Sequence, residues 1–270
     1  MGPHTLSQYP AWHPPAGLPL VYGPASPCPY LPDQPAHALR GLVTDHMPAR
    51  LYARLLDAGF RRSADLYYQP VCAGCRQCVP IRIPVSSFGP SRRQSRTLRD
   101  NEDLTSAFGP LDLTGEKLLL YQRYLAHRHH NHDATEDDLR RFLYQPTGFT
   151  AEITYRQRSD ARLVAVSIVD IVPPYMSSVY CYFDPGLPRR RLGVYTILAE
   201  IGLARSAGLP YYHLGYWIEA CSNMAYKADY RPAEVLRTDG RWCPLEPRTG
   251  HARHAPGGPE GELPTAGRVD

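Results

Sequence analysis

Three cysteines within seven residues, Cys72, Cys75 and Cys78, have the types and spacing in this chain that most clearly suggest chemistry. Thiolates at this spacing can converge on a zinc ion or an iron-sulfur cluster, which take about four thiolate ligands. Cys28, in a proline-rich turn sequence upstream, is the candidate for the fourth ligand. A redox switch and simple core packing are the alternatives, because cysteine also behaves as a small buried hydrophobe.

Composition sets the general class of the protein. The 270 residues are 43% hydrophobic, which is enough for one large or two ordinary domains. No apolar run is long enough to span a membrane, and the first thirty residues lack a secretory signal pattern, so we expect a cytoplasmic protein. Its seven cysteines are then not a disulfide framework. Three have apolar or aromatic neighbours and are expected in the core: Cys181, Cys221 and Cys243.

Two blocks of arginines could neutralise the phosphates of a nucleic acid. The net charge is only +4, from 30 basic and 26 acidic residues, so total charge alone does not indicate such a partner. The local concentration of arginine does, because its planar fork suits phosphate. A solvated basic loop is the alternative for each block. The blocks are Arg92, Arg93, Arg96 and Arg99, and Arg189, Arg190 and Arg191.

Periodicity predicts four helices and at least five strands. Pro48 and Gly59 bound the first helix, and Thr135 with Asp138 forms a capping box for the third. The second helix ends in the histidine-rich segment 127–132, which we expect to face the helix dipole or a phosphate rather than a metal. Helices are expected at 48–58, from 114 into 127, at 135–144 and at 192–205. Strands are expected at 79–85, 150–155, 162–170, 176–182 and 211–214.

The strand order predicts an antiparallel meander in the second half of the chain. The two prolines of segment 79–85 place this strand at a sheet edge, because proline cannot donate to a ladder. Residues 1 to about 35 are rich in proline and aromatic residues, and we expect an extended strap without regular structure. We expect an N-terminal domain with the cysteine cluster at 1–105, a C-terminal transferase domain at 106–247 and a disordered tail at 248–270.

The strand, turn and helix at residues 176–205 resemble the acyl-donor site of the acetyltransferase-like (GNAT) fold. A helix N-terminus there offers backbone N–H groups to phosphate. We therefore predict an α+β protein with a central mixed sheet flanked by helices, GNAT-like, with a cysteine-containing N-terminal domain. Arg190 and Gly193 match that motif, whereas Tyr195 stands where glycine or alanine lets a pyrophosphate approach. This departure argues against an ordinary acyl-CoA donor.

Four motifs occur in order along most of the chain, from about Cys28 to Trp242. They are Cys28-Pro29-Tyr30-Leu31-Pro32, Cys72-Ala73-Gly74-Cys75 through Val79-Pro80-Ile81-Arg82, Tyr182-Phe183-Asp184-Pro185, and Tyr216 through Met224-Ala225-Tyr226-Lys227 to Tyr230-Arg231-Pro232. Together they resemble the arginyl-tRNA-protein transferase family. The short length most resembles its bacterial branch, the aspartate/glutamate leucyltransferases.

The resemblance implies transfer of leucine from leucyl-tRNA to the α-amine of proteins that begin with Asp or Glu, which marks them for degradation by the N-degron pathway. The implied partners are an aminoacyl-tRNA and these proteins, with no membrane and no DNA. The aminoacyl ester is already activated, so transfer requires no covalent nucleophile and no cofactor. In the family, the upstream cysteines have been linked to metal, iron-sulfur or haem binding.

Site residues follow from this chemistry. Tyr182 and Asp184 are candidates to orient the amine or the ribose hydroxyl, although Asp184 suits a turn equally well. Lys227, beside Tyr226, is the candidate cation near the acidic acceptor, with a surface lysine as the alternative. The arginine blocks, with Gly193 in the second, would bind the acceptor stem, which is read mainly by shape and phosphates.

Three other functions share part of the pattern. Arginyl transfer to the same acceptors is the first alternative, and only the resemblance to the bacterial branch favours leucine over arginine. An acetyl-CoA-dependent N-acetyltransferase shares the fold. A zinc-dependent RNA-binding module would use the cysteine cluster and the arginine blocks but leave the strand-turn-helix unused.

Overall fold

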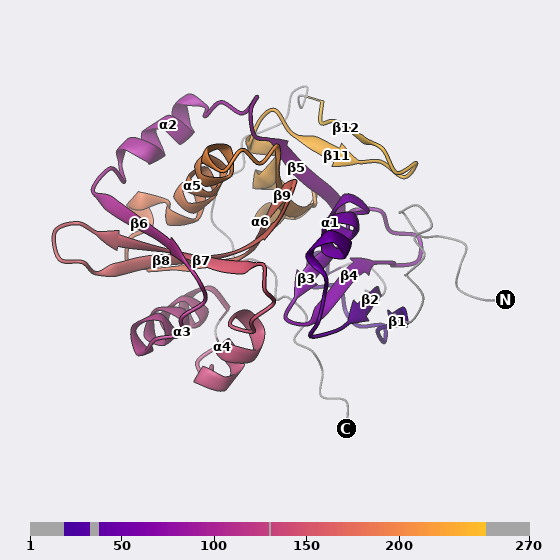
Figure 1. Cartoon of the computed structure of the whole chain (residues 1–270), viewed down its shortest axis with the longest axis horizontal. Helices are drawn as coiled ribbons and strands as arrows, with labels where there is room; N and C mark the ends of the chain where they lie inside the picture. The colour runs from indigo at the N-terminus through magenta and orange to yellow at the C-terminus, as the bar shows by residue number, and fades with distance from the viewer. Residues whose placement is uncertain (1–18, 33–37, 130, 247–270) are drawn as a thin grey trace.

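Two β-sheets of different size organise the chain (Figure 1). The computed structural model describes residues 19–32, 38–129 and 131–246. A small antiparallel sheet has the strand order β1-β2-β4-β3, and a large mixed sheet has the order β12-β11-β5-β10-β9-β8-β7-β6. Strands β9 and β10 are parallel, and the other neighbouring strands of the large sheet are antiparallel.

The elements have the following bounds. The strands are β1 Val21–Tyr22, β2 Leu39–Val43, β3 Arg61–Ser63, β4 Leu66–Pro70, β5 Val79–Pro84, β6 Leu104–Gly109, β7 Thr150–Gln157, β8 Leu163–Val172, β9 Tyr175–Phe183, β10 Tyr211–Trp217, β11 Glu234–Leu236 and β12 Trp242–Pro244. The helices are α1 Ala49–Asp57, α2 Arg92–Arg99, α3 Gly115–His129, α4 Glu136–Leu143, α5 Leu192–Ser206 and α6 Ser222–Ala225, with short 3-10 turns η1 Pro188–Arg190 and η2 Tyr226–Asp229.

The four predicted helices are confirmed as α1, α3, α4 and α5. Helix α1 starts after Pro48 and ends before Gly59, whose φ of 85° is the left-handed conformation that stops a helix. The capping box of α4 is present, because the side chains of Thr135 and Asp138 each accept from the other residue's backbone N–H. Helix α3 ends in the histidine-rich segment, as expected. None of the helices in the described part of the chain is both long and apolar enough to cross a membrane.

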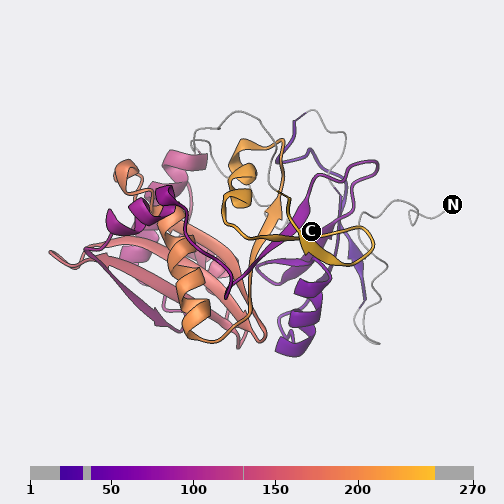
Figure 2. The same cartoon turned by 90° about the horizontal axis from the view of Figure 1, so that it is seen from above.

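The meander is confirmed, because β7, β8 and β9 pair in sequence order and antiparallel. Helix α5 and strand β10 follow it, so the predicted α+β class with a central mixed sheet flanked by helices is confirmed. Helices α2 and α5 cover one face of this sheet, and α3 and α4 cover the other (Figure 1, Figure 2). Each face has its own apolar core, one centred on Ile197 and Tyr212 and the other on Tyr124 and Leu139.

The prediction that segment 79–85 is an edge strand is wrong. Strand β5 lies inside the large sheet, between β10 and β11. Strand β11 pairs with it only at Ile81 and Arg82, so Pro80 and Pro84 lie where a single neighbouring strand pairs. Prolines can therefore occupy this interior strand, because the short strand β11 does not pair with β5 at either proline.

The irregular strap predicted for residues 1 to about 35 is wrong at β1, where Val21 and Tyr22 pair with β2. The remainder of the strap falls largely on residues 1–18 and 33–37, which lie outside the described residues, as does the predicted tail at 248–270. The predicted division at residues 105 and 106 stays a prediction. Strand β5, which precedes it, pairs with strands that follow it.

A buried ion pair joins the small sheet to the large one. Arg62 of β3 donates from Nε and Nη2 to both oxygens of Asp170 on β8, each at 2.8 Å, and both side chains are almost fully buried. Thr150 donates to the same carboxylate at 2.6 Å. Burial acts to lower the pKa of the Arg62 guanidinium. The charge of Asp170 and its hydrogen bonds outweigh burial, so the pKa is raised.

Removal of one partner from this pair is expected to destabilise the fold strongly. Arg62→Met leaves the Asp170 carboxylate buried without its counter-ion, and we expect unfolding in urea to show a loss of about 3–5 kcal/mol. Arg140→Gln, which breaks an exposed pair with Glu136 on α4, is the matched control and should cost less than about 1 kcal/mol. Combining Arg62→Met with Asp170→Leu should recover most of the loss; no recovery would mean that the charge is not its cause.

Candidate functional site

Strands β9 and β10 part shortly after they meet, and the candidate site is built around their separation. Their parallel pairing covers only three residue pairs and ends at Ser177 and His213. Each strand carries a bulge immediately beyond this point, at Val179 in its pairing with β8 and at Leu214 in its pairing with β5. Bulges bend strands away from their neighbours and are common next to active sites. The two strands therefore diverge toward their carboxyl ends.

Helix α5 begins beside the carboxyl end of β9. The turn η1 precedes it, and Arg191 at its N-cap has a left-handed φ of 51°. A Cβ atom added to Gly193 would lie 3.1 Å from Cε1 of Phe183, so glycine lets the first turn of α5 pack against β9. The predicted role of Gly193 in RNA binding stays a prediction, and close packing is a sufficient reason for this glycine.

The two arginine blocks lie together at the start of α5. A surface pocket of about 410 Å³ is lined by Asp100, Arg189, Arg190 and Arg191. Asp100 is the C-cap of α2, and Arg191 donates to Thr97 of the same helix at 3.3 Å. The first block is therefore a helix rather than a solvated loop, with a capping box in which Ser91 and Gln94 exchange hydrogen bonds.

The arginines of the two blocks differ in their partners. Arg190 donates from both Nη atoms to Asp103, each at 2.7 Å, which lowers the pKa of that carboxyl. The ion pair with Asp103 therefore fixes the position of the Arg190 guanidinium. Arg189 is exposed at the pocket. Four exposed arginines lie on the neighbouring helix: Arg92, Arg93, Arg96 and Arg99. The open cationic groups are therefore Arg189 and the side chains of α2, with α5 presenting its positive end beside them.

Tyr182 and Asp184 have structural partners. Tyr182 is fully buried against α3 and α4, and its hydroxyl lies 2.7 Å from that of Tyr144. Burial raises the pKa of Tyr182 far above its ordinary value. Asp184 accepts from the backbone N–H of Gly186 at 2.9 Å and pairs with Arg162. Both contacts favour the alternative in which Asp184 forms the turn after β9.

Lys227 and Tyr226 lie on the C-terminal side of the separated strands. Lys227 is buried, with 9% of its surface exposed, and its Nζ donates to the carbonyl of Tyr216 at 3.0 Å. The alternative of a surface lysine is therefore wrong, and the predicted role as a cation near the acceptor stays a prediction. Tyr226 is partly exposed, and its ring packs edge-on against Tyr230. The structure places Lys227 against β10, and Lys227 is not among the residues that line the arginine pocket.

The four upstream cysteines lie near one another beside the small sheet. Cys78 is buried in an apolar cluster with Tyr68 and Tyr216. Burial is the main cause that raises the pKa of Cys78 far above its ordinary value, and the charges of Cys72, Cys28 and Cys75 add to it. Within the described ranges, no group of three or more His, Cys, Asp or Glu side chains is arranged to hold a metal ion. Zinc or iron-sulfur binding stays a prediction without support from this arrangement.

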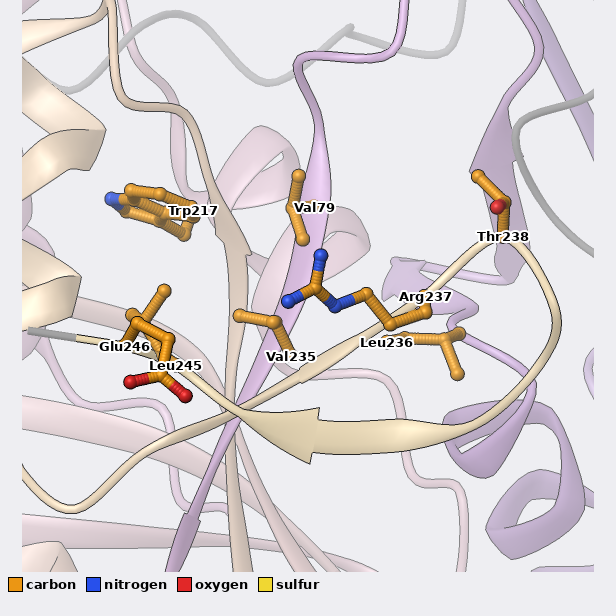
Figure 3. A pocket seen from close by; sticks show the side chains of 8 residues that line it. All are labelled: Val79, Trp217, Val235, Leu236, Arg237, Thr238, Leu245 and Glu246. Atoms are coloured by element: carbon orange, nitrogen blue, oxygen red, sulfur yellow. The ribbon is translucent and has the colours of Figure 1, made fainter.

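Sequence reasoning missed two features of the site. One is Arg61 of β3, which reaches across to β9 and donates from Nη1 to Oγ of Ser177 at 2.9 Å. The other is an apolar pocket of about 380 Å³ between the ends of β5, β10 and β11 (Figure 3). In Figure 3 the guanidinium of Arg237 points toward Val79. The lining consists of Val79, Trp217, Val235, Leu236, Arg237, Thr238, Leu245 and Glu246. No local signal could have revealed either, because both depend on strands far apart in sequence.

A buried carboxyl joins α5 to the paired part of β10. Glu200 of α5 has no exposed surface and accepts from the hydroxyl of Tyr212 on β10 at 2.6 Å. Burial raises the pKa of Glu200 to about 7, and hydrogen bonds from Tyr212, Ser167 and Ser178 oppose that rise. Glu200 is therefore largely protonated below neutral pH and couples α5 to β10 through a neutral hydrogen bond.

The chain matches known proteins along most of its length. Residues 26–96 match the family model "Arginine-tRNA-protein transferase, N terminus", and residues 116–237 match "Arginine-tRNA-protein transferase, C terminus". A relative from Hahella chejuensis named "Aspartate/glutamate leucyltransferase" is 40% identical over 219 residues, 80% of this chain and 93% of that protein. One of the same name from Gluconacetobacter diazotrophicus is 43% identical over 226 residues, 82% of this chain and 85% of that protein.

Similarity to solved structures is weaker. The C-terminal domain of a putative lysylphosphatidylglycerol synthetase from Agrobacterium fabrum has a TM-score of 0.43 and 16% sequence identity. The match covers 63% of this chain and 51% of that chain.

The raised pKa of Glu200 predicts a pH-dependent cost in stability. The folded state keeps the proton to about pH 7, whereas the unfolded carboxyl loses it near its ordinary value of 4.5, so stability falls as pH rises between these values. At pH 8 the cost amounts to roughly 3 kcal/mol. Urea unfolding of wild type and Glu200→Gln from pH 4.5 to 8 should show wild type losing stability relative to the variant as pH rises. A constant difference would mean that Glu200 has an ordinary pKa.

Proposed function

We propose that this chain, which belongs to the arginine-tRNA-protein transferase family, transfers leucine from leucyl-tRNA to the N-terminal Asp or Glu of proteins. The observation that carries the proposal is the match at 40% identity or more to proteins named for this transfer, over 80% or more of this chain. The meeting of the arginine blocks at the start of α5 supports it, because a tRNA partner requires a surface that binds phosphates.

The reaction needs only groups that the substrates bring. The lone pair of the acceptor α-amine attacks the ester carbonyl carbon of leucyl-tRNA, and the tetrahedral oxyanion collapses with cleavage of the bond to the ribose oxygen. One proton leaves the amine and one reaches the ribose oxygen, so atoms and charge balance without an oxidant or cofactor. The protein contributes position and electrostatic stabilisation. The α-amine has an ordinary pKa of about 7.7 to 8.0, so a modest base suffices.

The predicted catalytic residues enter this scheme in two groups. Tyr226 and Lys227 are the candidates for contact with the reacting groups, because they lie beside the carboxyl half of β10. Tyr182 and Asp184 would act by holding the end of β9 in place through Tyr144 and Arg162. We propose that the acceptor stem of the tRNA lies along α2 and the start of α5. The reaction would take place in the cytoplasm, where its products enter protein degradation.

Transfer itself is the decisive measurement. Purified protein is supplied with leucyl-tRNA or arginyl-tRNA and with peptides that begin with Asp, Glu or Ala and are otherwise identical. We expect leucine on the Asp and Glu peptides and none on the Ala peptide. Arginine on the same peptides would assign the chain to arginyl transfer. No transfer of either, with binding of acetyl-CoA in calorimetry, would favour an N-acetyltransferase; zinc-dependent RNA binding without transfer would favour a binding module.

The phosphate-binding surface has its own test. Arg189→Gln removes the exposed cation of the pocket, and we expect weaker tRNA binding and a salt dependence of the binding constant that is shallower by about one unit. Arg123→Gln, on exposed α3 at the opposite face, is the matched control and should leave both quantities unchanged. Equal behaviour of the two variants in filter binding from low to moderate salt would place the tRNA elsewhere.

A further inference from the structure

Arg61 fills the point at which β9 and β10 separate. Its Nη1 donates to Oγ of Ser177 at 2.9 Å, and its Nη2 donates to the carbonyl of Ser178. Gly215 of β10 has a φ of 90°, and a Cβ atom added there would lie 3.2–3.3 Å from three atoms of the guanidinium. The planar group therefore lies flat against the backbone at Gly215, with the last paired residue of β9 on its other side.

Arg61 has no carboxylate partner among the described residues, in contrast to Arg62 and Arg82. Arg62 has Asp170, and Arg82 has Glu234 and Asp57 as well as the rings of Tyr211 and Trp242. Asp170 accepts from Arg62 and Thr150, and the hydrogen bonds of Arg61 go to Ser177 and Ser178 instead. A partly buried guanidinium without a counter-ion is costly, so its presence calls for an explanation.

Three of the five donors of Arg61 remain open. The hydrogen bonds to Ser177 and Ser178 use one hydrogen on each Nη, and within the described part of the chain Nε and one further hydrogen on each Nη have no acceptor. A carboxylate fits this fork with two parallel charge-assisted hydrogen bonds, an arrangement that lysine cannot reproduce. A guanidinium with these donors open is the type of group that binds a carboxylate strongly.

A second cation lies on the same stretch of β10. Lys227 holds the carbonyl of Tyr216, the residue after Gly215, so two positive groups flank this stretch of backbone. The hydroxyl of Tyr30 lies close enough for Arg61 to act on it: burial raises the pKa of Tyr30, Tyr68 adds to the rise, and Arg61 opposes it. The surroundings are aromatic and cationic, which favours an anionic ligand over a neutral one.

We propose that Arg61 binds the side-chain carboxylate of the acceptor's N-terminal Asp or Glu and so determines the acidic specificity of the enzyme. This inference rests on the proposed function. Arg61 lies where the two strands open, so a carboxylate bound there would place the acceptor's α-amine within the region bounded by β9, β10 and Lys227. An acceptor that begins with neutral Asn or Gln would leave the Arg61 guanidinium without a counter-ion. Arg61 alone could therefore select against such acceptors.

The test compares two peptides that differ in one group. One begins with Asp and the other with Asn, and kcat/KM is measured for each at saturating leucyl-tRNA. Arg61→Gln should lower kcat/KM for the Asp peptide by about 10- to 150-fold, mainly through KM, because charge-assisted hydrogen bonds are lost. The Asn peptide should be unaffected, so the preference for Asp disappears. Arg54→Gln, which removes an exposed charge from α1, is the matched control and should keep wild-type kinetics.

The outcomes separate the two proposals. Leucine transfer by wild type to neither peptide contradicts the proposed function. A wild-type enzyme that prefers Asp, with an Arg61→Gln variant that keeps this preference or loses both activities equally, overturns the role of Arg61. If that variant does not fold, Arg61→Lys decides, because it keeps the charge but loses the fork: a reduced Asp to Asn ratio supports the proposal, and an unchanged ratio contradicts it. Filter binding of leucyl-tRNA should be the same for all folded variants.

Discussion

The structure depends on one constraint, which is that β9 and β10 can pair in parallel over only three residues. A bulge in each strand ends the pairing, so the two strands leave each other within the large sheet. Several of the candidate site residues lie around this separation. Helix α5 crosses above it with Glu200 bonded to Tyr212, and Arg61 of the small sheet fills its base. The small sheet thus contributes a side chain to the point where β9 and β10 separate.

The junction between the sheets shows how electrostatics fixes this arrangement. Adjacent residues of β3 have opposite surroundings, because alternate side chains of a strand point to opposite faces. Arg62 is satisfied by Asp170 and holds the sheets together, whereas Arg61 has no carboxylate partner among the described residues. Arg62 therefore stabilises the fold. Its ion pair with Asp170 also fixes the position of the adjacent Arg61. Similar division appears in the second arginine block, where Arg190 is paired and Arg189 is exposed.

Local patterns in the sequence predicted helices α1, α3, α4 and α5 and the meander, because their signals lie within a few residues. Pro48 and Gly59 bound α1, and Thr135 with Asp138 starts α4, as expected from capping chemistry. The place of β5 could not be predicted in the same way, because it depends on strands β10 and β11 far along the chain. Arg61 was missed for the same reason: its partners Ser177 and Ser178 are distant in sequence. Asp184 and Tyr182 were recognised from a motif whose contacts turn out to be structural.

The interior position of β5 also bears on how the protein is made. Strand β5 emerges from the ribosome long before β10 and β11, between which it will lie. Until those strands are synthesised, its two edges and the apolar side chains of Ile81 and Ile83 lack their native cover. The small sheet and the meander can form earlier from neighbouring segments, so assembly ends with closure of the large sheet from its carboxyl-terminal side. The separation of β9 and β10 is then completed last, and we expect a truncated chain to expose an aggregation-prone edge of β5.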